Sequence, residues 1–277
     1  IWLRGGRCWL RAMLSQWSGE ERLHANVLTP VLISGKQGLS KSTFCRLLMP
    51  DSLRHYFIDN LNLTAGSSPE KKLVKNGLIN LDEFDKIKES QQATLKNLLQ
   101  MVNVPVFRGK RLGWVNESRL ASFIATTNVY QVLIDSTGSR RFLCVEVLKP
   151  ISEEPLEHKQ IYAQLKEELK SGAPDYLNKE EEKALQKHNK AYYRQSLLED
   201  VFHCCFRHPL ETEKGIWLTT AEIFQVMRKF NSTALKEVSA RQLGLKLSAM
   251  GYMAKHTSFG NRYYVFNLSA EKKDVSL

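Results

Sequence analysis

A stretch near the start of the chain has the composition of a phosphate-binding loop. It nearly fits the pattern G-x-x-x-x-G-K-[ST] and reads Gly35, Lys36, Gln37, Gly38, Leu39, Ser40, Lys41, Ser42, Thr43. In such a loop, successive backbone N–H groups form a cradle for the phosphates of a nucleotide. Lys41 is then expected to reach the β- and γ-phosphates, and the Ser42 hydroxyl is expected to hold Mg²⁺. We therefore expect ATP and Mg²⁺ to bind here.

Ser40 is the one departure from this pattern, which has Gly at that position. If the loop needs a positive φ there, serine introduces a modest strain. The serine side chain is small enough to leave room for the phosphates, so we expect the loop to be competent. The alternative is a decayed loop that binds nucleotide without hydrolysing it.

Two adjacent carboxylates, Asp82 and Glu83, follow an apolar run that ends at Leu81. At the end of a strand, such a pair would place Asp82 in the metal shell and Glu83 beside the attacking water. The alternative is an acidic pair on the surface, and the following Phe84 and Asp85 do not discriminate between the two. The position directly after an apolar run favours the chemical role.

Asn128 and an arginine pair follow further along the chain. Asn128 is predicted to present its amide to the water or to the γ-phosphate, although an asparagine after a strand is more often a turn former. Arg140 or Arg141 would stabilise the charge that develops in phosphoryl transfer, and can come from a neighbouring subunit. For either arginine alone, a structural ion pair or a DNA contact is an equal alternative.

These groups need a sheet to bring them together, and four short apolar runs supply one. The runs lie at residues 31–34, 78–81, 123–126 and 142–147, separated by helical stretches. Continuous apolar strands of this kind indicate a parallel sheet covered by helices on both faces. The carboxyl ends of such strands are where open α/β sheets bind ligands. With an amphipathic helix over 1–26, this predicts an α/β P-loop ATPase domain over residues 1–150.

The remaining chain is predicted to form a helical connector and a small module. Within the connector, 151–206, Asn178 and Glu181 form a capping pair for a helix that runs to about Phe206. Helices at 221–230 and 240–250 and a hairpin over 252–266, with its turn at 258–261, come next. Two helices followed by a hairpin is the winged-helix order. We expect a winged-helix-like α+β module at 207–268 and a tail at 269–277.

The chain is strongly basic, with 40 Lys and Arg against 29 Asp and Glu, a net charge of +11. This excess points to a polyanion such as DNA, the alternative being a generically basic surface. A cationic stretch beside Trp114 would track phosphates while the tryptophan stacks on bases, or is a solvated loop. Winged helices bind proteins as well as DNA. The predicted nucleic-acid contacts are Arg108, Lys110, Arg111, Arg241, Lys246, Lys255 and Arg262.

Composition excludes several classes. Of the 277 residues, 43% are hydrophobic and 25% charged, which excludes disordered, collagen-like and coiled-coil proteins. No apolar run approaches the roughly 18 residues of a membrane span. The five cysteines lack C-x-x-C spacing and the seven histidines lack metal spacing, which argues against a zinc site. Adjacent Cys204 and Cys205 are expected to be buried. We expect a cytoplasmic protein, and the start at Ile1 suggests a fragment.

The set of motifs resembles the virulence-associated E proteins, P-loop ATPases of phages and mobile elements. These are similar to superfamily-three helicases and primase-associated AAA+ ATPases. Residues 35–44, 79–85, 122–128 and 137–142 carry the resemblance, and the segment beyond 207 resembles the C-terminal module of some members. The resemblance implies an AAA+-like fold, ATP hydrolysis coupled to DNA work in replication, a primase-like region upstream, and a homo-oligomer such as a hexameric ring.

Three functions remain open from the sequence. The first is a helicase-like ATPase motor on DNA. The second is a DNA-binding replication initiator that senses nucleotide without hydrolysing it. The third is a small-molecule kinase, against which the Asp82–Glu83 pair and the basic C-terminal module both argue.

Overall fold

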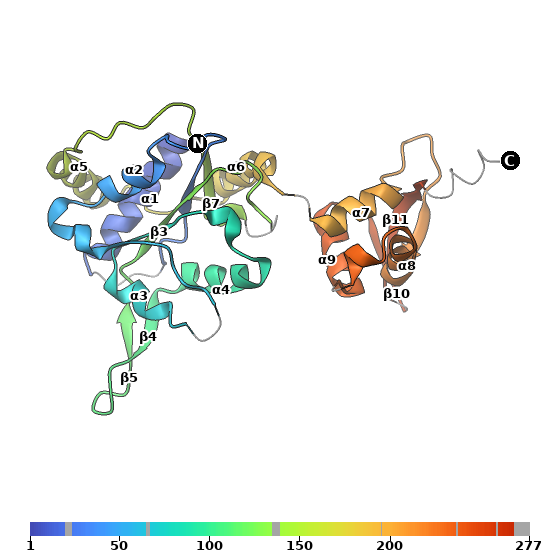
Figure 1. Cartoon of the computed structure of the whole chain (residues 1–277), viewed down its shortest axis with the longest axis horizontal. Coiled ribbons are helices and arrows are strands. Elements are labelled where there is room, and N and C mark those ends of the chain that lie inside the picture. The colour runs from blue at the N-terminus through green and yellow to red at the C-terminus, as the bar shows by residue number, and fades with distance from the viewer. Residues whose placement is uncertain are drawn as a thin grey trace. The chain divides into compact units, whose positions relative to one another are not determined.

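The four predicted apolar runs are strands of one parallel sheet in the computed structural model, which describes residues 1–19, 24–64, 67–134, 139–194, 196–236, 238–258 and 260–268. A fifth strand, which the sequence analysis missed, completes the order β2-β3-β6-β1-β7 (Figure 1). The strands are β1 (Thr29–Ile33), β2 (Phe57–Asp59), β3 (Leu78–Leu81), β6 (Ser122–Thr127) and β7 (Phe142–Glu146).

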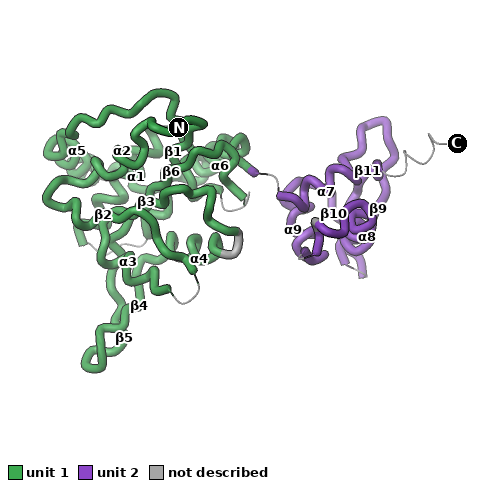
Figure 2. Tube along the Cα trace, viewed as in Figure 1, with its two compact units in different colours: residues 1–193 green, residues 194–277 purple. Residues whose placement is uncertain are grey.

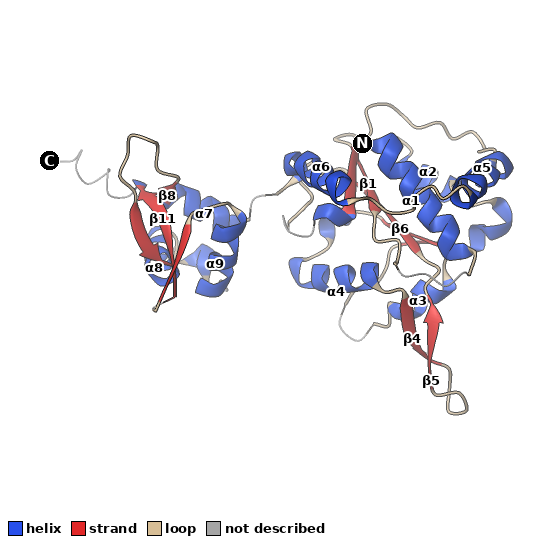
Figure 3. Cartoon of the chain, turned by 180° about the vertical axis from the view of Figure 1, so that it is seen from behind, coloured by secondary structure: helices blue, strands red, loops and turns tan. Residues whose placement is uncertain are grey.

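Helices cover both faces of this sheet, as predicted (Figure 3). Alternate strand residues point to opposite faces. Leu32 and Ile124 therefore pack with α1 and α2, whereas Ile33 and Phe123 pack with α3 and α4. The helices are α1 (Trp2–Trp17), α2 (Lys41–Leu47), α3 (Glu70–Lys75), α4 (Glu89–Gln100), α5 (His158–Lys170) and α6 (Lys179–Asn189), with short 3-10 turns η1 (Asp51–Tyr56), η2 (Phe84–Lys86), η3 (Ser139–Arg141) and η4 (Lys190–Tyr192).

A hairpin projects from this unit where the sequence analysis predicted only a cationic stretch (Figure 1). Its strands, β4 (Asn103–Phe107) and β5 (Trp114–Ser118), pair antiparallel. Val104 and Val106 are buried and anchor β4 to the sheet's core, while Asn103, Pro105 and Phe107 are exposed. The polar and exposed β5 explains why no strand was predicted, because it has no apolar alternation of its own.

The second unit contains an antiparallel sheet in which β11 pairs with β8, β9 and β10. The two predicted helices and the hairpin are confirmed; Phe259, in the predicted turn, lies outside the described residues. The elements are α7 (Leu197–Cys205), β8 (Phe206–Arg207), β9 (Ile216–Thr219), α8 (Thr220–Phe230), η5 (Thr233–Leu235), α9 (Ala240–Ala249), β10 (Ala254–Thr257) and β11 (Gly260–Asn267).

The chain divides at Tyr193, and not at the predicted bounds 150 and 207 (Figure 2). The compact units are Ile1–Tyr193 and Arg194–Leu277, so α5 and α6 belong to the first and α7 to the second. The single helix predicted from Asn178 to about Phe206 is wrong. Its start is capped as expected, but Ser196 and Glu199 form a new capping box and begin α7. The predicted tail, 269–277, lies outside the described residues.

Two further predictions concern the adjacent cysteines and membrane-spanning helices. Cys205 is buried as predicted, but Cys204 is exposed, because the two neighbours lie on different sides of α7. None of the helices formed by the described residues combines the length and apolarity needed to cross a membrane.

Candidate active site

A cavity of about 360 Å³ lies where β1, β3 and β6 end. The carboxyl ends of parallel strands meet at one edge of the sheet, so the loops that follow them converge there. The cavity is lined by Gln37, Gly38, Leu39, Ser40, Lys41, Ser42, Thr43, Asp82, Glu83, Asp85, Thr126, Thr127, Asn128 and Val129. Three segments separated in sequence thus meet as the sequence predicts.

The loop contains a left-handed serine. Ser40 has φ 60° and ψ 27°, so the strain that the sequence analysis made conditional is present. Its hydroxyl donates a hydrogen bond to Glu153 Oε1 at 2.6 Å instead of capping α2. Gly38 also has a positive φ, of 78°, and a Cβ there would face open space. The backbone N–H groups at the start of α2 therefore have no side-chain cap.

Gly35 and Lys36, which were also predicted to bind nucleotide, do not line the cavity. A Cβ at Gly35 would lie 2.9 Å from Tyr130 Cε2, so the close approach of that ring requires glycine. The Lys36 carbonyl accepts a hydrogen bond from Ser34 Oγ at 2.6 Å. These contacts involve the loop but not the lining of the cavity.

Lys41 is only 8% exposed and is held at two points. Its amine donates to Asn128 Oδ1 at 2.8 Å and to the Ser34 hydroxyl. Burial lowers the pKa of Lys41, and the nearby Asp82 carboxylate opposes this shift only in part. The predicted loop lysine and the predicted sensor asparagine are therefore in direct contact.

Asp82 contacts the hydroxyl that was predicted to share a metal with it. Asp82 Oδ1 accepts from Ser42 Oγ at 3.3 Å and also from the Thr126 hydroxyl. Hydroxyl and carboxylate oxygens suit Mg²⁺, which proteins hold through one or two carboxylates together with substrate phosphates. Within the described residues no three His, Cys, Asp or Glu side chains form a metal group.

Glu83 lines the cavity but is 59% exposed and paired. Its Oε1 lies 2.6 Å from Lys86 Nζ, and its backbone is left-handed with φ 51°. Asp85, which the sequence analysis set aside, accepts from Thr127 Oγ1 at 2.5 Å. The predicted water-activating carboxylate is thus at the cavity, held by a lysine three residues on.

Neither Arg140 nor Arg141 lines the cavity. Arg140 Nη1 lies 3.4 Å from Glu182 Oε2 on α6, and Arg141 is half-buried. Of the motif that includes them, Thr137 and Gly138 lie outside the described residues. The role of Arg140 and Arg141 in phosphoryl transfer stays a prediction.

The predicted nucleic-acid residues of the first unit lie on the β4–β5 hairpin. Arg108 forms a two-pronged ion pair with Glu117 across the hairpin. Lys110 and Arg111 are exposed at the tip. Trp114 is 73% exposed, with its ring 5.7 Å from that of Phe107. Cations and an exposed aromatic ring therefore share the tip.

The predicted contacts of the second unit differ among themselves. Arg241 and Lys255 are exposed, whereas Arg262 is half-buried and its Nε has no hydrogen-bond partner in the part of the chain that the structure describes. Lys246 Nζ lies 3.4 Å from the buried Glu199 carboxylate. Its ammonium is therefore partly engaged in holding α9 to α7.

Four side chains at the site were not predicted as functional. Hydroxyls at strand ends, such as Ser34 and Thr126, carry a weak signal, because polar residues that end buried strands face the ligand edge. Asp85 lies close to a motif that was recognised. Glu153 has no sequence signal, since its contact with Ser40 depends on where the segment after β7 passes.

Comparison with known proteins gives a family for most of the chain. The model described as "Virulence-associated protein E-like domain" matches residues 25–194, and a domain of unknown function from B. Theta, DUF3874, matches residues 195–265. No curated protein matches by sequence.

Solved structures of the NrS-1 C-terminal region are similar at low levels. In its A form without ligand, the NrS-1 region has 17% identity and a TM-score of 0.42, over 90% of this chain and 59% of that chain. A second apo structure has 14% identity and a TM-score of 0.43, over 95% and 70%. This chain thus spans little more than half the length of the first structure. On the match over residues 25–194, the chain belongs to the virulence-associated protein E-like domain family.

Proposed function

We propose that the first unit is a P-loop ATPase that binds ATP with Mg²⁺ and hydrolyses it, in a protein that works on DNA during replication. One observation carries the proposal: the Lys41 amine, the Ser42 hydroxyl and the Asp82 carboxylate line a single cavity. This is the constellation that phosphoryl-transfer sites on this type of sheet use.

The chain's own residues divide the work. The open N–H groups of the loop orient the phosphates, and the desolvated Lys41 amine pairs with their oxygens, which restores the favourable environment that burial removed. Ser42 and Asp82 would hold Mg²⁺, which supplies charge neutralisation to the transferring group. Asn128 positions Lys41 through its amide oxygen.

Glu83 is the proposed base for the attacking water. Its ion pair with Lys86 occupies Oε1, which leaves Oε2 as the oxygen that would accept from the attacking water. Arg140 or Arg141 would act on the cavity of a second copy of the chain, because neither lines its own. This role would require a homo-oligomer, such as the hexameric ring that the family resemblance implies.

DNA is the proposed substrate of a helicase-like motor. The β4–β5 tip offers Lys110 and Arg111 to phosphates and Trp114 to bases, and Arg108 would join them by leaving its ion pair with Glu117. In the second unit, whose element order supports a winged helix, Arg241 on α9 and Lys255 on β10 are exposed for backbone contacts, and Arg262 lies opposite Lys255 on the hairpin. The net charge of +11 favours such binding.

The test is an ATPase assay with and without single-stranded DNA. Lys41→Ala should lose ATP binding, whereas Glu83→Gln should bind ATP and lose turnover. The matched control is Glu167→Gln, because Glu167 is an exposed carboxylate that pairs with a lysine three residues on, as Glu83 does. Persistent turnover in Glu83→Gln would refute the assignment of the base.

A second candidate, a nucleotide sensor that does not hydrolyse ATP, is favoured by two contacts. Ser40 is strained and bound to Glu153, and Glu83 is bound to Lys86. Tight ATP binding by the unaltered protein without any phosphate release, with or without DNA, would support this candidate over the ATPase.

A further inference from the structure

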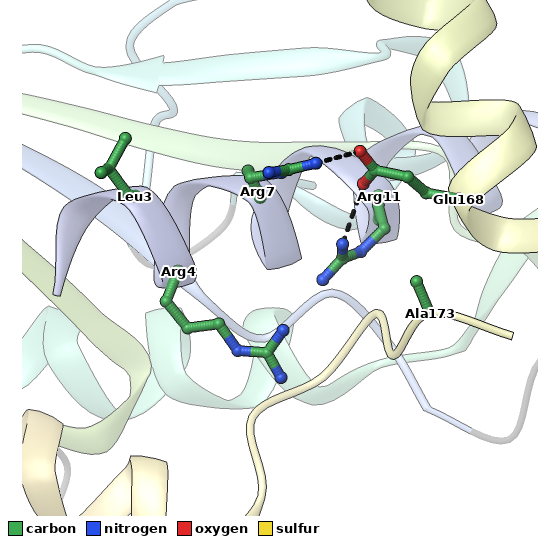
Figure 4. Close-up of a pocket in the computed structure, with 6 residues that line it drawn as sticks. All are labelled: Leu3, Arg4, Arg7, Arg11, Glu168 and Ala173. Carbon is green, nitrogen blue, oxygen red and sulfur yellow. Dashed lines mark hydrogen bonds and ion pairs between the residues drawn. The ribbon is translucent and has the colours of Figure 1, made fainter.

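A second cavity of the first unit, of about 470 Å³, lies beside the arginines of α1. Figure 4 shows Arg7 and Arg11 reaching from α1 to Glu168 of α5, while Arg4 turns toward the lower part of the view; Ala173 belongs to the loop after α5. The arginines recur three and four residues apart, so they lie on one face of α1. The lining residues are Leu3, Arg4, Arg7, Arg11, Glu168 and Ala173, none of which lines the candidate active site.

Carboxylates hold one edge of each guanidinium. Glu168 accepts from Arg7 Nη2 and, at 2.9 Å, from Arg11 Nη1, while Glu181 accepts from Arg4 Nε at 2.6 Å. Burial alone would raise the pKa of Glu168, but the hydrogen bonds it accepts outweigh this and lower it, so the carboxylate stays charged. Among the described residues, the other terminal nitrogens of Arg4 and Arg7 have no hydrogen-bond partner.

Arg11 carries an unpaired donor that is buried. The residue is 4% exposed, and its Nε and Nη1 donate to the Pro174 carbonyl and to Glu168. Its Nη2 is also buried, yet it has no hydrogen-bond partner among the described residues. Figure 4 shows this end of Arg11 turned toward the space between Arg4 and Ala173. A charged donor without an acceptor is costly in a folded protein, so an acceptor from outside fits this place.

The charges and shapes define the acceptor. Glu168 and Glu181 pair with the three guanidiniums, and among the described residues they leave donor groups of the arginines that have no further partner. All three arginines line this cavity, and a phosphate group has enough oxygens to accept from more than one of them. The cavity volume falls in the range that holds a nucleotide-sized molecule.

We propose that this pocket is a second anion site that binds a phosphate group, with Arg11 as its buried anchor and Arg4 and Arg7 as its outer donors. The phosphate is that of a free nucleotide or the 5′ end of a nucleic acid, which share this chemistry. The site does not depend on ATP hydrolysis, because it shares no lining residue with the other cavity.

The test measures inorganic phosphate binding to the full chain by equilibrium dialysis. Lys41→Ala serves as the background, since it removes the proposed phosphate contact of the other cavity. We expect the Lys41→Ala protein to bind one phosphate saturably. Arg4→Gln and Arg7→Gln, both at exposed side chains, should each weaken it about tenfold, the loss typical of a charge-assisted hydrogen bond.

Arg54→Gln is the matched control, because Arg54 also pairs with a carboxylate at the surface. It should bind phosphate as the background does. Arg11→Gln should abolish phosphate binding. If this change at a buried residue prevents folding, the Arg4→Gln and Arg7→Gln variants test the proposal. No saturable binding in the Lys41→Ala background, or equal binding in the Arg4 and Arg7 variants, would overturn the proposal.

Competition then identifies the source of the phosphate. Displacement by AMP supports a free nucleotide, and displacement only by a 5′-phosphorylated oligonucleotide supports a nucleic-acid end. Equal displacement by the same oligonucleotide with a 5′-hydroxyl would contradict the site, because general attraction to the DNA backbone would then explain the binding.

Discussion

The helix that follows the loop of the candidate active site and the helices of the second unit begin in opposite ways. In the second unit α7, α8 and α9 begin at Ser196, Thr219 and Ser239, and each has a capping box that satisfies backbone N–H groups. In the first unit α2 begins after Ser40, which is left-handed and whose hydroxyl bonds Glu153 instead. Capped N–H groups stabilise a fold, whereas uncapped ones are free for a ligand, so stability and binding compete for the same donors.

The largest expected effect separates the two carboxylates of the cavity. Asp82→Asn should lower ATP turnover by about a hundredfold or more, because it removes the charge beside Ser42 where the metal is proposed. Asp85→Asn should change turnover far less, since Asp85 bonds Thr127. Steady-state phosphate release measures both. Equal losses in the two variants would mean that Asp82 has no special role.

A loss of about 1 kcal/mol is expected when a cap of the second unit is removed. Thr219→Ala takes away the hydroxyl that accepts from the Glu222 N–H at the start of α8. Hydrogen exchange of the α8 amides in the full chain measures the effect in that unit. Ser258→Ala, at an exposed serine, is the control and should leave exchange unchanged. An unchanged Thr219→Ala protein would show that the capping box adds nothing.

The opposite sign is expected at Ser40. Ser40→Gly should raise the stability of the first unit by about 0.5 kcal/mol. Glycine has no Cβ and adopts a φ of 60° without strain, and this gain should exceed the loss of the hydrogen bond to Glu153. Urea unfolding measures it. Urea unfolding of the Glu153→Gln variant measures the contribution of the hydrogen bond between Ser40 and Glu153 alone. A destabilised glycine variant would mean that the bond to Glu153 is the stronger of the two effects.

The smallest effect is an acid dependence of the second unit. Hydrogen bonds from Arg207 lower the pKa of Glu213 to about 2 from a usual 4.5. A carboxylate with a lowered pKa contributes stability above its unfolded pKa and loses it as the pH falls through the folded value. Stability should therefore decline between about pH 4.5 and 2, and the Glu213→Gln variant should decline less. Parallel declines in acid titrations of the two proteins would contradict this.

The parallel sheet and most of the cavity were predictable because both depend on local patterns. Apolar runs such as 31–34 mark strands buried on both faces, and the residues just after them must lie at the ligand edge. The α/β class and the presence of Lys41 and Asn128 at one cavity follow from that rule, whereas the hydrogen bond between them was not predicted.

Other features depend on distant contacts that leave no local trace. Glu153 reaches Ser40 only because the chain after β7 passes over the loop, and Lys246 meets Glu199 only when α9 packs on α7. The break between α6 and α7 did have a signal, the pairing of Ser196 with Glu199, but a continuous helical pattern concealed it.

The fixed position of the Lys41 side chain has a thermodynamic consequence. A lysine on a surface samples many rotamers and loses that freedom when it binds a ligand. Ser34 and Asn128 already restrict the four-carbon arm of Lys41, so its ordering entropy is lost during folding. An arriving anion would exchange hydrogen-bond partners with an immobile amine, and its affinity would be reduced less by conformational cost.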